Sequence, residues 1–353
     1  MSTSLIKPTT EIEPKSEVQA ITDLSALNEI RLQTARHAIS ENSWKAYQKS
    51  WSRFERWCIQ HRLPHLPASN ETLQLFVTAL LEGLVETQDG KLGSPVSIRT
   101  MDQFLAAITF VHKNLQLQHP VVPEQDYRAI RRKHGKAPKK KQAITQEELK
   151  AIVHTITPKQ PTEGEVLRVY RDRAILLVAF ASGGRRRSEI AAMQYEELTR
   201  QSDGSYRWLL SRSKTDQEGE GLELLIPVLP GQVLECPART LARWMEKAKI
   251  TSGPVFRSID QWGNMGSTAI TPGIVAKLVK ETVQKIGLDP SHYAGHSLRS
   301  GFATDMARKG VRLENIMQRT GHKSVAIAQG YVQAAQLGSA LDPILQALGT
   351  KDG

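Results

Sequence analysis

Two histidines, an arginine and a tyrosine fall within one short stretch, residues 295–331 (GHSLRSGFATDMARKGVRLENIMQRTGHKSVAIAQGY). His296 and Arg299 are three residues apart, so at the start of a helix their side chains project to the same side. His322 and Tyr331 follow the next predicted helix. Each of the four can hold a proton or a phosphate oxygen, so together they could serve acid–base or phosphoryl-transfer chemistry. Taken singly, each has a simpler explanation, because short motifs of this kind are common in ordinary helices.

Two further polar groups lie upstream of this stretch. In GGRRRSEI, Arg186 stands three residues before Glu189, after a glycine turn and at the start of a short predicted helix. Because Arg185 and Arg187 flank it, the choice of Arg186 depends on this spacing alone. Lys214 lies in a turn, SKTDQEGEG, between two predicted strands, and no other lysine lies on that pair of strands.

The composition points to a basic protein without a cofactor. The formal net charge is +11 over 353 residues, which favours a polyanionic partner such as nucleic acid over a solvated surface without meaning. Cys58 and Cys236 lie far apart with no metal-binding spacing around them, so we expect no metal, no cofactor and a reducing, cytoplasmic setting. The longest apolar run, AILLVAFA, is too short to cross a bilayer, so no membrane partner is expected.

The elements that must position the polar groups are mostly helical. We expect helices over about 145–156, where Thr145-x-x-Glu148 forms a capping box, and over 164–181, 237–248, 297–309 and 314–320. Gly310 and Gly321 end the last two. RWLLSRS and LELLIPV are strand-like, so one small antiparallel sheet should accompany these helices. Residues 144–338 are therefore predicted to form one mostly helical domain.

The first half of the chain predicts a small helical bundle over residues 23–134, after a disordered tail at 1–22. Its first helix carries an aromatic stripe that we interpret as core: Trp44, Tyr47, Trp51, Phe54 and Trp57. Lys45 and Lys49 fall on other faces of that helix, where they contact DNA or simply meet solvent. Two more helices are expected over about 69–84 and 97–112, and no strand pattern is present.

A strongly basic segment, RAIRRKHGKAPKKK, joins the two halves. It holds eight Lys or Arg and no acidic residue, so it cannot form a packed core by itself. We interpret it as a basic hinge against phosphates, with the linker proper at 135–143; a nuclear-localisation signal and a plain flexible linker are the alternatives. Its candidate DNA contacts are Arg131, Arg132, Lys139, Lys140 and Lys141.

The order Arg, Lys, His-x-x-Arg, His, Tyr in these contexts resembles the tyrosine recombinase (phage integrase) family, over about residues 25–345. The resemblance implies a mostly α fold with a small antiparallel β-sheet. A helical core-binding (SAM-like) domain and an α+β catalytic domain would form a C-shaped clamp on DNA. It also implies binding to double-stranded DNA with inverted repeats, as a homodimer on one site and a homotetramer in synapsis.

The resemblance further implies a role for each polar group. Tyr331 would attack a DNA phosphodiester, giving a 3′-phosphotyrosyl link and a free 5′-hydroxyl. Arg186, Arg299 and His322 would hold the phosphate, and His296 would assist proton movement. Lys214 would protonate the leaving oxygen, and Glu189 would support the site. Guanidinium groups suit these roles because they stay charged and match phosphate geometry.

Strand exchange through a Holliday junction is the activity that the layout favours. A type IB topoisomerase-like activity would use the same chemistry without partner exchange, and a non-catalytic DNA-binding protein is the third alternative. The short apolar segment ALDPILQAL lies in the C-terminal tail, residues 339–353, and either docks onto a neighbouring subunit or folds back on its own domain.

Overall fold

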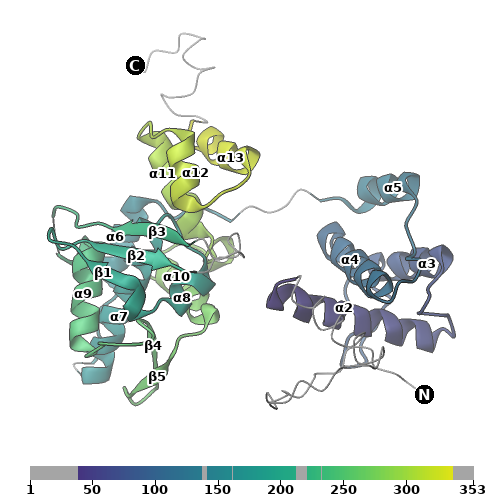
Figure 1. Cartoon of the computed structure of the whole chain (residues 1–353), viewed down its shortest axis with the longest axis horizontal. Helices are drawn as coiled ribbons and strands as arrows, with labels where there is room; N and C mark the ends of the chain where they lie inside the picture. The colour runs from purple at the N-terminus through teal and green to yellow at the C-terminus, as the bar shows by residue number, and fades with distance from the viewer. Residues whose placement is uncertain (1–38, 137–140, 161, 212–220, 232, 337–353) are drawn as a thin grey trace, which may run out of the picture. The chain divides into compact units, whose positions relative to one another are not determined.

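The computed structural model of the chain describes residues 39–136, 141–160, 162–211, 221–231 and 233–336. The chain divides into two compact units, residues 1–138 and 139–353. The N-terminal tail, Lys139, Lys140, Lys214 and the C-terminal segment 339–353 lie outside the described residues. Figure 1 labels the helices and strands of both units.

Unit 1, residues 1–138, is a helical bundle in its described part. It contains α2 (Glu41–Gln60), α3 (Asn70–Leu81), α4 (Ile98–Asn114) and α5 (Glu124–His134). Serine side chains at 40, 69 and 97 accept backbone N–H groups at the starts of the first three helices, as N-caps do. The aromatic stripe of α2 faces inward: Trp51 and Phe54 are buried with Phe76 and Met101 in one core.

Helix α5 corrects the expectation that the whole basic segment is a hinge, because its first part, residues 128–134, is helical. Tyr127 and Ile130 pack against the core of unit 1, and the Tyr127 hydroxyl donates to Asp102 at 2.6 Å. Lys133 pairs with Glu82 at 3.0 Å. The run therefore folds because a few apolar and acidic partners offset its self-repulsion.

Unit 2, residues 139–353, combines eight described helices with short strands. The helices are α6 (Gln146–Thr155), α7 (Glu163–Ala181), α8 (Arg187–Ala192), α9 (Pro237–Lys247), α10 (Pro272–Lys285), α11 (Ser297–Arg308), α12 (Leu313–Thr320) and α13 (Val325–Gln336). The predicted capping box of α6 is formed by Thr145 and Glu148. Strands β1 (Leu198–Arg200), β2 (Tyr206–Leu210) and β3 (Leu222–Ile226) make an antiparallel sheet in the order β1-β2-β3.

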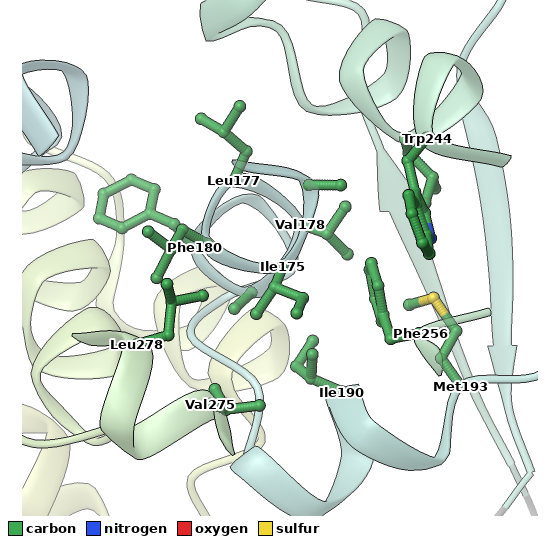
Figure 2. Close-up of a cluster of buried hydrophobic side chains, with 14 of the residues drawn as sticks. Ile175, Leu177, Val178, Phe180, Ile190, Met193, Trp244, Phe256, Val275 and Leu278 are labelled. Carbon is green, nitrogen blue, oxygen red and sulfur yellow. The ribbon is translucent and has the colours of Figure 1, made fainter. Parts of the chain in front are cut away.

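Helix α7 runs through the core of unit 2. Its residues 174–180 are all buried, and Figure 2 shows Ile175 and Val178 among side chains from several other elements, including Trp244 and Phe256. The C-terminal part of α7 is apolar on every side and is covered on every side, and Gly183 and Gly184 in the turn that follows are buried as well. The expected fold class, mostly helical with small antiparallel sheets, is confirmed.

A second sheet was not expected. Strands β4 (Arg257–Ile259) and β5 (Met265–Ala269) pair antiparallel, joined by a turn in which Gly263 has φ +94°. Neither strand alternates between buried and exposed residues, so period-two patterning gives no sign of them.

Candidate active site

The site is built on a glycine turn between α7 and α8. Gly183 and Gly184 have φ values of +90° and +66°, which favour glycine. A Cβ at Gly183 would lie 2.3 Å from the Arg319 carbonyl oxygen, and one at Gly184 would lie 2.0 Å from the Arg299 Cα. The turn can therefore touch α12 and α11 directly only because both residues lack side chains.

The arginine triplet after this turn splits into three environments. Arg186, the N-cap of α8, donates from Nη1 to the buried Glu189 carboxylate at 2.8 Å and from its backbone N–H at 3.0 Å. Arg185 is buried beneath it: its Nε lies 3.8 Å from Glu189, and its Nη2 donates to the Arg319 carbonyl at 2.9 Å. Arg187 is exposed. The Glu189 carboxylate therefore accepts a hydrogen bond from Arg186 and forms an ion pair with Arg185.

Tyr331 and His296 meet across helices of the same chain. Helix α13 packs against α11 and α12, and His296 is the N-cap residue of α11. The Tyr331 hydroxyl lies 3.2 Å from His296 Nε2. This distance allows the phenol to donate its proton to the imidazole.

Arg299 and His322 are hydrogen-bonded to each other within the site. Arg299 is buried, its Nε donates to His322 Nε2 at 3.1 Å, and its buried Nη1 has no hydrogen-bond partner among the described residues. The His322 and Tyr331 rings lie 5.5 Å apart between centroids. A buried guanidinium with a free donor is suited to an anion such as a phosphate.

The electrostatics of the site favour neutral histidines beside fixed positive charge. Burial, reinforced by Arg299 and Arg186, lowers the pKa of His296, although part of its side chain is exposed. Burial and the same cation Arg299 lower the pKa of His322 to about 4, and burial lowers that of Arg299 to about 10. Burial raises the pKa of Tyr331, and Arg299 opposes that rise. At neutral pH the phenol is therefore protonated, and His296 is free to accept its proton.

The expected site residues divide by position. The structure brings together Arg186, Glu189, His296, Arg299, His322 and Tyr331 in unit 2, whereas Lys214 lies outside the described residues. Within the described ranges, no group of three His, Cys, Asp or Glu side chains could hold a metal ion. Nor does any helix among them have the length and apolar character needed to span a membrane.

The expected DNA contacts are spread over both units. Lys45 and Lys49 are exposed on α2, and Lys45 lies 3.6 Å from Glu41. The Arg131 guanidinium lies 5.2 Å from the centre of the Tyr127 ring, and Arg132 is exposed. Lys141 donates to the Ser291 carbonyl at 2.5 Å in unit 2. Nothing in these contacts selects among the candidates.

Two residues of the site were missed by sequence reasoning. Arg185 was visible only as a neighbour of Arg186, and spacing cannot say which arginine of a triplet points inward. Thr320, two residues before His322, has its hydroxyl 2.7 Å from His322 Nδ1, a contact that needs the turn at Gly321 to form.

Known proteins that resemble this chain align with most of its length. Residues 142–337, more than half of the sequence, match the phage integrase family. The chain belongs to that family. This integrase-family protein is 33% identical over 304 residues to the integrase/recombinase xerD homolog of Selenomonas ruminantium, an alignment that covers 84% of this chain and 83% of that protein. It is 23% identical over 343 residues to the recombinase cre of Escherichia phage P1, covering 91% and 92% of the two chains.

Solved structures share the fold of the integrase-family protein. The XerH site-specific recombinase bound to difH substrate, in a pre-cleavage complex, aligns with a TM-score of 0.57 at 16% identity, over 92% of this chain and 83% of that one. A lambda integrase dimer bound to a COC′ core site aligns with a TM-score of 0.53 at 14% identity, over 90% and 78%. At these identities the likeness concerns the fold.

Proposed function

We propose that this protein is a site-specific DNA recombinase that cuts and rejoins strands through a phosphotyrosine intermediate. The observation that carries the proposal is the Tyr331 hydroxyl 3.2 Å from His296 Nε2, beside the buried Arg299 with its free Nη1. Family membership and relatives described as recombinases and integrases point the same way.

In the proposed first step, the scissile phosphate is held by Arg186 and Arg299, through their guanidinium groups, and by His322. The Tyr331 oxygen attacks phosphorus and its proton passes to His296. The bond from phosphorus to the 5′-oxygen breaks, leaving a 3′-phosphotyrosyl link, and Lys214 supplies the proton that makes the leaving oxygen a 5′-hydroxyl. Guanidinium donors that are in place before the reaction stabilise the charge that develops on the phosphate.

The second step is the reverse reaction with a different strand. The covalent link keeps the energy of the phosphodiester, so the 5′-hydroxyl of another strand can displace Tyr331 without ATP. Exchange of both strand pairs proceeds through a Holliday junction, between two inverted-repeat sites that each hold a homodimer. The synapse is then a homotetramer.

Unit 2 offers a surface for assembly in such a synapse. A pocket of about 470 Å³ is lined largely by apolar side chains of α6, α7 and α11, among them Leu149, Phe180 and Phe302. The C-terminal segment ALDPILQAL of a neighbouring subunit has the apolar character to fill it. This contact is part of the proposal for the tetramer.

The nucleophile is tested with Tyr331→Phe, and Tyr195→Phe on the surface of unit 2 is the matched control. DNA flanking the gene is first footprinted to find the target site. On that site, Tyr331→Phe should bind like the unaltered protein but form no covalent protein–DNA adduct, whereas Tyr195→Phe should form it normally. An adduct with Tyr331→Phe would show that another residue is the nucleophile.

The exchange step is tested with a plasmid that carries two copies of the target. Recombinant circles are expected. Relaxation of the plasmid without recombinants would instead support a topoisomerase-like activity, and binding without either product would support a non-catalytic DNA-binding protein.

A further inference from the structure

Helices α7 and α12 end close together in unit 2, and an arginine binds the end of each. Helix α7 ends at Ala181, whose carbonyl oxygen accepts a hydrogen bond from Arg319 Nη2 at 2.8 Å. Helix α12 ends at Thr320, and the carbonyl oxygen of Arg319 accepts a hydrogen bond from Arg185 Nη2 at 2.9 Å. The last carbonyl groups of a helix have no partner within it, and that end of the helix carries partial negative charge. Both guanidinium groups therefore bind where a cation is favourable.

The two contacts are reciprocal. Arg185 follows α7 in the chain and binds the end of α12, whereas Arg319 lies in the last turn of α12 and binds the end of α7. The two hydrogen bonds join residues that are 134 and 138 positions apart in the sequence. Arg319 Nη2 also donates to the Leu225 carbonyl of β3. Arg185 and Arg319 are called the arginine pair below.

The arginine pair contacts both turns that carry groups proposed to hold the phosphate. A Cβ at Gly321 would lie 3.1 Å from Arg185 Nη2, so this guanidinium packs against the turn that leads to His322. Arg185 Nε lies 3.8 Å from Glu189, the carboxylate that accepts a hydrogen bond from Arg186. Arg185 is thus in contact with the turn of Arg186 and with the turn of His322.

Stability alone does not account for the arginine pair. Burial lowers the pKa of both guanidinium groups, and Arg185 lowers the pKa of Arg319 further. Neighbouring cations repel each other, and burying them costs free energy that an apolar contact would avoid. The end of α12 is also closed without them, because the N–H groups of Gly321 and His322 donate to the Met317 carbonyl at 2.7 and 3.1 Å. The cost favours a role in the geometry of the site.

We propose that Arg185 and Arg319 are positioning residues that hold the turn of Arg186 against the turn of His322. The inference rests on the proposed recombinase function, in which Arg186 and His322 hold one phosphate from these two turns. With a single hydrogen bond left, the turns can pivot about it, so both bonds are needed to fix the distance between them. Neither residue of the arginine pair touches the phosphate itself.

The test uses Arg319→Met and Arg185→Met, which replace each guanidinium group by an apolar side chain. Arg173→Met is the matched control, because Arg173 is also buried in unit 2 and its Nε donates at 3.3 Å to the Val153 carbonyl, in the last turn of α6. Single-turnover cleavage is measured with saturating DNA, well below the unfolding midpoint of each variant. Under these conditions a loss of stability alone leaves the rate unchanged.

Arg319→Met and Arg185→Met should each cleave about 10²-fold more slowly, the loss expected when groups of an active site move by about 1 Å. The double variant should be no slower than the slower single variant, and Arg173→Met should cleave at the normal rate. Normal cleavage by Arg319→Met or Arg185→Met, losses that multiply in the double variant, or equal slowing by Arg173→Met would each overturn the proposal. Should Arg185→Met not fold, Arg319→Met, at a half-buried position, decides the question by itself.

A second measurement does not depend on activity. Besides burial, the groups that lower the pKa of His322 are Arg299, His296, Arg186 and Arg185. Arg319 is not among them, so Arg319→Met can change this pKa only by moving the turns, which alters the burial of the ring or its distance from Arg185. NMR titration of the histidine-labelled protein, with the signal assigned by His322→Gln, should show the pKa rising from about 4 toward 6.5 in Arg319→Met. A pKa that stays at about 4 would contradict the proposal.

The two measurements separate this inference from the proposed function. If the unaltered protein cleaves no DNA, the proposed function fails, while the titration still decides whether the arginine pair holds the two turns together. If Arg319→Met shifts the pKa of His322 yet cleaves at the normal rate, the arginine pair does not position the phosphate-binding groups, and the proposal is wrong.

Discussion

His112 in unit 1 and His322 in unit 2 are held in the same chemical state by different partners. His112 Nδ1 bonds to the Ile108 carbonyl at 2.8 Å, and its Nε2 accepts the Ala68 backbone N–H at 3.0 Å. His322 has Thr320 and Arg299 in the same two places. Burial lowers the pKa of both imidazoles. His112 thus links two backbone segments in a core. His322 instead accepts a hydrogen bond from the guanidinium of Arg299, the residue proposed to hold the phosphate. A neutral histidine bonded at both ring nitrogens therefore stabilises the fold of unit 1 and orients the Arg299 guanidinium in unit 2.

The largest expected effect comes from breaking the histidine of the site. His322→Leu removes the acceptor of Arg299 Nε, so the guanidinium loses its fixed direction. Cleavage of the target should fall by about 10²–10³, the range seen when one oxyanion donor is lost. Single-turnover assays measure it, with the exposed His154→Leu as a control. A variant that cleaves within threefold of normal would contradict a directing role for His322.

Breaking the histidine of unit 1 should instead cost stability. His112→Leu leaves the buried Ala68 N–H without an acceptor, so the unfolding free energy of unit 1 should fall by about 1–3 kcal/mol. Urea unfolding followed by pulse proteolysis can resolve the two units. The two substitutions serve as controls for each other: if His112→Leu slows cleavage as much as His322→Leu while unit 1 stays folded, the division of roles between them is wrong.

The smallest expected effect is on the pH dependence of stability. A fold that lowers the pKa of a histidine favours its neutral form, so its contribution is complete above the ordinary pKa of 6.5 and is lost as the pH falls toward the folded value. For His322 that window runs from 6.5 down to about 4. His322 should remove about 1 kcal/mol from unit 2 between pH 6.5 and 5.5, and His112 should lower the stability of unit 1 in the same direction.

The same unfolding assay checks this at the two pH values. His112→Gln should flatten the pH dependence of unit 1 alone, and His322→Gln that of unit 2 alone. Equal flattening of both units by one substitution would mean that the two histidines are not independent.

Much of the fold follows from local signals in the sequence. Ser69 and Ser97 begin their helices, Thr145 and Glu148 form a capping box, and Gly321 ends α12, because such residues satisfy the free backbone groups of helix ends. The β4–β5 hairpin escaped prediction because its short strands show no alternation. Helix α5 was not predicted because the dense positive charge of its C-terminal part indicated an unpacked segment, whereas Tyr127 and Ile130 pack against the core of unit 1.

The site was predictable as a set of residues but not as a geometry. Spacing selected Arg186 and the His296–Arg299 pair, residue type and position added His322 and Tyr331, and the family resemblance supplied the role of each. Which arginine of the triplet is buried, and which nitrogen of His322 is protonated, depend on how closely α11, α12 and the glycine turn approach. Those distances are set by packing between segments more than a hundred residues apart, as between Arg185 and the Arg319 carbonyl.

Gly183 and Gly184 put bare main chain against the Arg319 carbonyl and the Arg299 Cα. At most packed positions in a protein, side chains separate the main chains of neighbouring segments. Because the turn has no side chains at these two positions, a displacement of its main chain would act directly on α12 and on α11, which carries Arg299. Anyone building variant libraries to retarget this protein should therefore keep both glycines fixed and diversify the exposed surface around them.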